Sequence, residues 1–220
     1  MMKDNIKKII AILFLIPFIN LGFIIFNFEV YLNLNTLIII ISFTLILSID
    51  IIIRPISQRR DQYKYTKLSI LLFLLLPLIS IVPYLEFKLL IQQYFIIWNN
   101  YSLFIAGIIV LLLGGILLIY SRILLGKFAS SKIIVEQNHT LMTNGIYKYI
   151  RHPIYLGMLL VFFGYGLSFK SCITPFTFLI LFFIIFNNRM NLEEKLLKEK
   201  FGRDYELYLE RSKRLIPYIY

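Results

Sequence analysis

Residues 101–120 read YSLFIAGIIVLLLGGILLIY, a run of 20 positions without a charged side chain. An α-helix rises about 1.5 Å per residue, so roughly 20 apolar residues match the hydrocarbon core of a bilayer. Similar apolar runs occupy residues 9–28, 37–53 and 68–82. The sequence therefore predicts several membrane-spanning helices rather than a single water-soluble core.

The composition of the whole chain agrees with a membrane protein. Of its 220 residues, 59% are hydrophobic and 16% are charged, whereas a soluble domain is about 45–50% apolar and about 25% charged. The formal net charge of +11 comes from short Lys and Arg clusters between apolar runs, so nucleic acid is not an expected partner. One cysteine and two histidines argue against a disulfide and against a metal site.

Two further apolar runs follow, at residues 154–169 and 173–186, and a short polar turn separates them. Both are short for a span, and together they predict a tight helical hairpin. The residues after the hairpin contain apolar side chains at helical spacing, Leu192, Leu196, Leu197 and Phe201. The expected fold is an all-α integral membrane protein with about six transmembrane helices, the last two a short helical hairpin, followed by a cytoplasmic amphipathic C-terminal helix.

The positive charges predict the orientation of these helices. With six spans, 21 of the 23 Lys and Arg residues fall on one side of the membrane, and the positive-inside rule assigns that side to the cytoplasm. Both termini, the loop 121–152 and the tail 187–220 are then cytoplasmic. A re-entrant hairpin would give the same charge pattern. The first apolar run is too long for a signal peptide and is interpreted as a retained span.

Polar side chains that carry possible chemistry lie on both sides of the predicted hairpin. Pro153 suits the first turn of a helix, which places Arg151 and His152 at a helix N-terminus, a favourable position for an anion. Glu193 and Glu194 follow the hairpin and would suit a cationic ligand. The alternative interpretation makes the basic residues interfacial anchors and pairs the acidic ones with cations at i, i+4, as Arg189 with Glu193 and Glu194 with Lys198.

The residues around this hairpin resemble a known family. The pattern is His139-x-Leu141-x-x-x-Gly145-x-Tyr147-x-x-x-Arg151-His152-Pro153-x-Tyr155-x-Gly157, followed by Arg189, Glu193-Glu194, Phe201-Gly202 and Tyr205-x-x-Tyr208. It resembles the isoprenylcysteine carboxyl methyltransferase family and its phospholipid methyltransferase relatives. We therefore divide the chain into N-terminal transmembrane helices, residues 1–100, with about three variable spans, and a methyltransferase core, residues 101–220.

The resemblance implies an S-adenosylmethionine-dependent methyltransferase embedded in the membrane and acting on a lipid-tailed acceptor. The leading acceptor is the carboxylate of a prenylated cysteine, which needs no metal and no general base. By similarity, the catalytic residues are Arg189, which we expect nearest the acceptor carboxylate, Arg151, which could exchange roles with it, and Glu194. The cofactor-binding residues implied by the resemblance are His139, Leu141, Gly145, Tyr147, His152, Tyr155, Glu193 and Glu194.

Other functions stay open at the level of sequence. N-methylation of a phospholipid headgroup would require a base, for which Glu193, Glu194 or His152 is available. A membrane reductase that uses NADPH shares part of the C-terminal pattern, and a non-catalytic membrane protein is a further alternative. Asp50, the only ionisable residue within the spans, is expected to pair with Arg54. The cell membrane, or the endoplasmic reticulum in a eukaryote, is the expected location.

Overall fold

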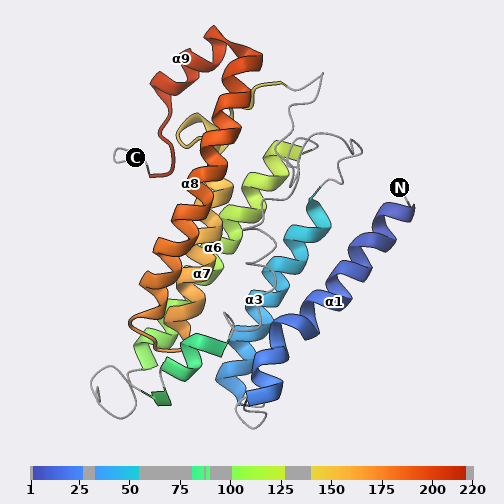
Figure 1. Cartoon of the computed structure of the whole chain (residues 1–220), viewed down its shortest axis with the longest axis vertical. Helices are drawn as coiled ribbons and strands as arrows, with labels where there is room; N and C mark the ends of the chain where they lie inside the picture. Colours follow the sequence, from blue (N-terminus) through green and yellow to red (C-terminus); the bar gives the residue numbers. More distant parts are fainter. Residues whose placement is uncertain are drawn as a thin grey trace.

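The computed structural model describes residues 2–26, 33–54, 81–86, 88–89, 101–126 and 140–216. Within these residues the regular structure is helical, apart from one isolated bridge between extended residues. Figure 1 shows the long helices running along one axis as an elongated bundle. Their bounds are α1 (Met2–Phe26), α3 (Leu34–Ile53), α6 (Tyr101–Leu125), the 3₁₀ turn η4 (Gly145–Lys148), α7 (Pro153–Ser168), α8 (Thr174–Phe201) and α9 (Arg203–Arg211).

Helices α6 and α7 make the most extensive contact in the bundle, and glycines allow it. A Cβ atom added at Gly107 would lie 2.3 Å from the backbone nitrogen of Ser168, and one at Gly164 would lie 2.4 Å from that of Leu111. Both distances are too short for a real Cβ contact. The two backbones therefore approach as closely as small residues permit, which is how helices pack tightly in membranes.

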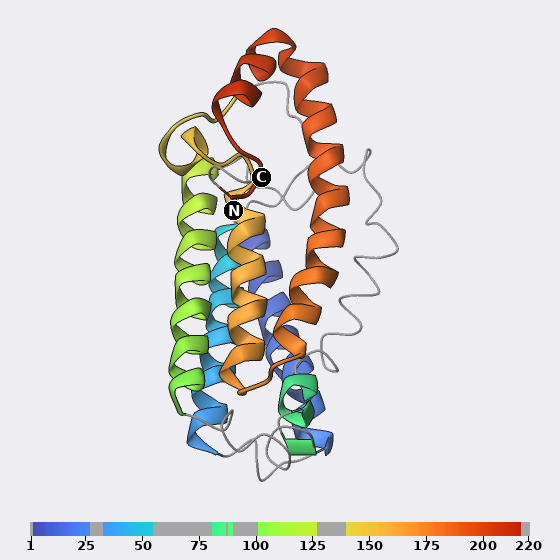
Figure 2. The same ribbon diagram turned by 90° about the vertical axis from the view of Figure 1, so that its left-hand side faces the viewer.

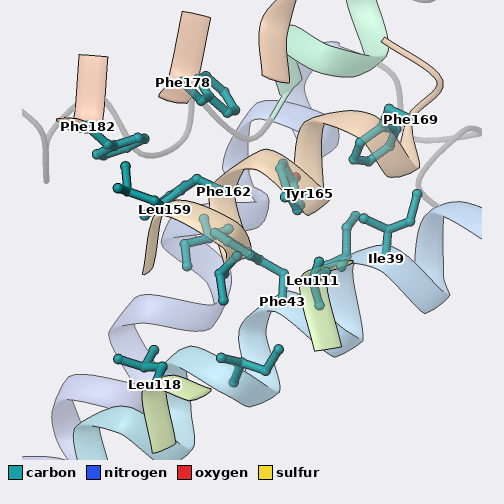
Figure 3. Close-up of a cluster of buried hydrophobic side chains, with 14 of the residues drawn as sticks. Ile39, Phe43, Leu111, Leu118, Leu159, Phe162, Tyr165, Phe169, Phe178 and Phe182 are labelled. Atoms are coloured by element: carbon teal, nitrogen blue, oxygen red, sulfur yellow. The ribbon is translucent and has the colours of Figure 1, made fainter. Parts of the chain in front are cut away.

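Aromatic side chains fill the core between α3, α7 and α8 (Figure 3). The ring of Phe43 in α3 lies 4.3 Å, centroid to centroid, from that of Tyr165 in α7. The Phe162 ring of α7 also contacts Phe43, at 5.7 Å, and stacks on the Phe182 ring of α8 at 3.9 Å. Helix α7 is thus enclosed by α3, α6 and α8, with its buried rings joining the N-terminal helices to the C-terminal ones.

The apolar character expected of the helices is confirmed. Helices α3, α6 and α8 are each long and apolar enough to cross a membrane, and α7 is a shorter apolar helix of 16 residues. The predicted run 9–28 corresponds mainly to α1, whereas the run 68–82 lies outside the described residues except for its last two positions. The protein is a helical integral membrane protein, and the number of six spans stays a prediction.

The C-terminal part differs from the amphipathic surface helix that we expected. Residues 187–201 are the last turns of α8, which continues without interruption from its apolar part. These positions contain neither Gly nor Pro, so nothing breaks the hydrogen-bond ladder until Gly202, whose φ is 50°. Figure 2 shows α8 rising well beyond the other long helices, with α9 folded back from its end.

The turn between α7 and α8 is held by a residue from far earlier in the chain. The Glu86 carboxylate accepts hydrogen bonds from the backbone nitrogens of Cys172 (2.8 Å), Ile173 (2.7 Å) and Thr174 (2.7 Å). These are N–H groups at the start of α8, which would otherwise lack partners within the helix. Glu86 therefore caps α8 from outside it, and its negative charge suits the helix N-terminus.

Candidate functional site

The candidate site lies at the end of the bundle from which α8 projects, where α7 begins (Figure 2). The chain returning from α9 pairs there with the residues that precede α7. Arg151 N donates to the Lys213 carbonyl (2.8 Å), His152 N to the Arg214 carbonyl (3.1 Å), and Lys213 N to the Tyr149 carbonyl (2.9 Å). These backbone hydrogen bonds hold the tail against the start of α7.

Glu194 of α8 is the centre of a charged cluster built from both segments. Its Oε1 lies 2.9 Å from His152 Nε2 and 3.3 Å from Arg151 Nε, while its Oε2 lies 3.1 Å from Arg214 Nη2. Burial raises the pKa of Glu194, but the hydrogen bond to His152 and the charges of His152, Arg214 and Arg151 outweigh it, so that the pKa lies below its ordinary value. Glu194 is therefore a carboxylate at neutral pH.

Arg214 joins the cluster to two asparagines of α8. Neither asparagine was predicted from the sequence as a site residue. Arg214 Nη1 donates to Asn187 Oδ1 at 2.9 Å, and its Nη2 donates to Asn191 Oδ1. Asn187, Asn191 and Glu194 stand at i, i+4 and i+7, so they share one face of the helix. That spacing was visible in the sequence, but the partner of this face comes from the tail and could not be inferred from it.

Arg151 is held on its other side by the tail. Its Nη1 donates to the carbonyl oxygens of Ser212 (2.5 Å) and Leu209 (3.4 Å). With Nε directed to Glu194, its guanidinium is shared between one carboxylate and two backbone acceptors. Arg151 thus fixes the tail and Glu194 relative to each other.

Glu193 faces a second group of residues beside the cluster. The Tyr155 hydroxyl donates to Glu193 Oε2 at 3.1 Å, and that oxygen lies 4.0 Å from His152 Nδ1. Arg189, one turn earlier in α8, also hydrogen-bonds to Tyr155. The Tyr155 ring lies 5.2 Å from that of Phe186, in the apolar part of α8. Polar and apolar surfaces therefore meet at Tyr155.

Tyr147 and Gly145 shape the loop before α7. Tyr147 is buried, its hydroxyl donates to the Ser121 carbonyl of α6 (3.2 Å), and its own carbonyl accepts from the Tyr208 hydroxyl (2.6 Å). Gly145 begins η4 with a φ of 59°, a conformation that favours glycine. Leu141 is half-buried, and His139 lies outside the described residues.

The structure brings five of the predicted site residues into direct contact, and the roles given to them stay predictions. These five are Arg151, His152, Tyr155, Glu193 and Glu194. The suggested exposed pair of Glu194 with Lys198 is wrong, because Glu194 binds the cluster and Lys198 pairs with Glu206 of α9 at 2.9 Å. The proximity of Arg189 to the cluster follows from its place on α8.

The protein is a helical integral membrane protein with a partly buried charged cluster at one end of its bundle. Residues 102–204 match the family model described as phospholipid methyltransferase. Over 115 residues the chain is 32% identical to protein-S-isoprenylcysteine O-methyltransferase B of Arabidopsis thaliana, covering 51% of this chain and 58% of that protein. The Schizosaccharomyces pombe protein-S-isoprenylcysteine O-methyltransferase is 32% identical over 84 residues, 38% of this chain and 36% of that one.

A solved structure has the same fold. It is the eukaryotic intramembrane Ras methyltransferase ICMT, isoprenylcysteine carboxyl methyltransferase, with a TM-score of 0.65, 19% identity, and coverage of 84% of this chain and 65% of that one. The resemblance to the isoprenylcysteine carboxyl methyltransferase family and its phospholipid methyltransferase relatives is thereby confirmed. The chain spans little more than half the length of the Arabidopsis relative.

Proposed function

We propose that this protein is an S-adenosylmethionine-dependent methyltransferase that esterifies the carboxylate of a prenylated cysteine. The observation that carries the proposal is the cluster around Glu194, in which His152, Arg151 and Arg214 converge at the start of α7. Arg151, His152 and Glu194 lie within residues 102–204, which match the phospholipid methyltransferase family model, and a relative named for esterification of a prenylated cysteine is similar to the chain over 115 residues. The apolar helices beside it would receive the lipid tail of the acceptor.

The charges of the cluster fit the groups of S-adenosylmethionine. Arg151 and Arg214 together bring two positive charges to the single negative charge of Glu194, so the surplus positive charge would attract a further anion, such as the carboxylate of the cofactor's amino acid part. The Glu193 side chain, 34% exposed, is available for the cofactor's ammonium group or ribose hydroxyls.

A buried hydroxyl beside the cluster also favours a bound polar ligand. Tyr205 is 1% exposed, and its hydroxyl has no hydrogen-bond partner among the described residues. Buried polar groups are almost always paired, and each exception calls for an explanation. A cofactor group entering beside Glu194 and Arg151, which act electrostatically on Tyr205, would supply such a partner after a small rearrangement.

Arg189 is the residue that we assign to the acceptor carboxylate. Arg151 was the alternative, but its guanidinium is divided among Glu194 and the carbonyls of Ser212 and Leu209. Arg189 instead lies beside Tyr155, one turn before Glu193 and close to the apolar part of α8. It is therefore placed where a lipid-tailed carboxylate would arrive from the membrane.

In the proposed mechanism the chain binds and orients rather than transferring protons. S-adenosylmethionine supplies an electrophilic methyl group on a sulfonium centre. Arg189 holds the ionised acceptor carboxylate, which needs no base, in a fixed direction. The Tyr155 face is suited to contact with a sulfonium cation, and the packed rings of Tyr155 and Phe186 would exclude water from the reacting atoms.

N-methylation of a phospholipid headgroup is the second candidate, and the description of the matched family model favours it. An amine acceptor must lose a proton, and Glu193, hydrogen-bonded to Tyr155 and partly exposed, is the group available to accept it. The two candidates differ in their products, because a methyl ester is cleaved by base and a methylated amine is not.

The orientation of the protein belongs to the same proposal. We place the Glu194 cluster and both termini on the cytoplasmic side, since 21 of 23 Lys and Arg residues lie at that end of the predicted spans. The acceptor's polar end would then be presented at the cytoplasmic surface of the cell membrane, or of the endoplasmic reticulum in a eukaryote.

Direct binding of S-adenosylmethionine to the purified protein in nanodiscs tests the proposal. We expect micromolar affinity for the wild type and weaker binding for His152→Ala and Glu194→Gln. Glu206→Gln is the matched control, because Glu206 forms an exposed ion pair on α9 away from the cluster. Wild-type protein that is folded but does not bind the cofactor contradicts the proposed function.

A further inference from the structure

A buried ion pair joins α3 to α6 near the end of the bundle that carries the Glu194 cluster. Asp50 of α3 is 2% exposed and Arg122 of α6 is 4% exposed. One Asp50 oxygen accepts from Arg122 Nε, and the other accepts from Arg54 Nη2. The expected Asp50–Arg54 contact is therefore confirmed, but Asp50 also has a second partner 72 positions along the chain.

This pair fixes the last turns of α6 relative to α3. A buried charge that loses its partner is strongly unfavourable, so the two helices keep the register that holds Asp50 and Arg122 together. Asp50 lies outside residues 102–204, which match the family model, whereas Arg122 lies within them. The contact thus connects the N-terminal helices to the matched segment.

The last turns of α6 in turn support η4. The carbonyl of Ser121, the residue next to Arg122, accepts from the Tyr147 hydroxyl at 3.2 Å. Gly145 packs against Leu124, since a Cβ atom at this glycine would lie 2.7 Å from Leu124 Cδ1. Tyr147 also accepts from Tyr208 of α9 through its carbonyl. A displacement at the end of α6 would therefore be transmitted to η4, five residues before α7.

We propose that Asp50 is a positioning residue, which holds η4 and the adjoining start of α7 in place through Arg122 and the end of α6. The N-terminal helices then contribute to the geometry of the site as well as to packing. This inference rests on the proposed function only where it uses S-adenosylmethionine affinity as a readout. The effect of Asp50 on η4 can be measured without S-adenosylmethionine.

The test compares Asp50→Asn with the wild type in nanodiscs by two measurements. Hydrogen exchange of the amides of Tyr147, in η4, and of Tyr149 and Ile150, just after it, which donate to the carbonyls of Asn144 and Ile146, reports on the loop directly. S-adenosylmethionine affinity reports on the site. We expect faster exchange in η4 with unchanged exchange in the middle of α7, and an affinity roughly two- to thirty-fold weaker, the range observed for mutations that act through a connecting network. Asp50→Glu should restore part of both.

Glu206→Gln serves as the control and should change neither readout. Lower thermal stability of Asp50→Asn with unchanged η4 exchange and unchanged affinity would overturn the inference, because that is what a merely structural pair predicts. If Asp50→Asn does not fold, Arg122→Lys takes its place, because it keeps the positive charge but lacks Nε. The same hydrogen exchange in η4 is then measured for Arg122→Lys, and faster exchange is again expected. If the wild type does not bind S-adenosylmethionine but Asp50→Asn still shows faster exchange in η4, the positioning role is supported and only the proposed function is refuted.

Discussion

Arg189 is the residue on which the proposed chemistry depends most. It lies beside Tyr155 and one turn before Glu193, and we assign it to the acceptor rather than to the cofactor. Arg189→Gln should therefore lower kcat/KM for the prenylated acceptor by about 100-fold, the scale of a lost orienting contact. Its affinity for S-adenosylmethionine should change little.

Steady-state kinetics with each substrate varied in turn, together with cofactor binding, separate these two effects. Arg189→Lys is the informative second variant, because it keeps the charge without the planar, two-pronged geometry of guanidinium. A loss of cofactor affinity equal to the loss of kcat/KM would contradict the assignment of Arg189 to the acceptor.

At the scale of residues, the sequence predicted which residues form the site better than it predicted which residues contact one another. Arg151 and His152 were recognised because Pro153 marks the start of a helix, and Glu193 and Glu194 because they follow the apolar run 173–186 closely. Arg214 was not recognised as a site residue, although it contacts Glu194 and two asparagines. Its role depends on the return of the chain after α9, and no local pattern encodes that return.

Helix α8 is capped by Glu86, and this predicts an effect of pH on stability. Burial raises the pKa of Glu86, but hydrogen bonds from Thr174 and from the backbone of Ile173, Thr174 and Cys172 outweigh it, so the pKa lies below its ordinary value of 4.5. The folded protein therefore binds the Glu86 proton less tightly than the unfolded chain. The contribution of Glu86 is present above about pH 4.5 and is lost as the pH falls below that value.

Glu86→Gln should accordingly lower the free energy of unfolding at pH 7 by about 0.5–2 kcal/mol, the range for loss of a helix cap. The difference from the wild type should narrow as the pH falls below 4.5, because the wild-type carboxyl then takes up its proton. Thermal unfolding in detergent over a series of pH values from 7 downward checks this. A difference that stays constant with pH would show that the charge of Glu86 contributes nothing to the cap.

The close packing of α6 against α7 leads to a second prediction at the scale of helices. Gly164→Ala would place a Cβ atom 2.4 Å from the Leu111 backbone, so the helices must separate. We expect a loss of about 1–3 kcal/mol in the free energy of unfolding, as for other overpacked cores. Ile116→Ala, at a side chain of α6 that is 65% exposed, is the control and should stay within about 0.5 kcal/mol of the wild type. Equal effects of the two substitutions would refute close packing at Gly164.

The helices themselves were largely predictable, because long apolar runs leave little choice of structure in a membrane. The predicted runs 101–120 and 37–53 correspond to α6 and α3. The predicted boundary after residue 186 is wrong, because α8 continues across the change from apolar to polar residues. Hydropathy marks where a bilayer ends, whereas a helix ends at a residue such as Gly202.

As a whole molecule, the protein places a charged cluster at one end of a bundle whose described helices expose many apolar side chains. Side chains such as Leu13, Phe14 and Ile116 are exposed in the absence of lipid, as expected for surfaces that face a bilayer. The Glu194 cluster is held together by α7, α8 and the tail after α9. This arrangement suits a reaction between a polar cofactor and an acceptor delivered by the membrane.

The decisive measurement of the proposed function is transfer of a labelled methyl group from S-adenosylmethionine to a farnesylated cysteine, with purified protein in nanodiscs. We expect a labelled product that requires the free carboxylate of the acceptor, releases its label in base, and is lost with Glu194→Gln but retained with Glu206→Gln. Transfer of a base-stable label to phosphatidylethanolamine in the same nanodiscs, with none to the farnesylated cysteine, would contradict the ester assignment. Folded protein that transfers label to neither acceptor would contradict the proposed methyltransferase activity.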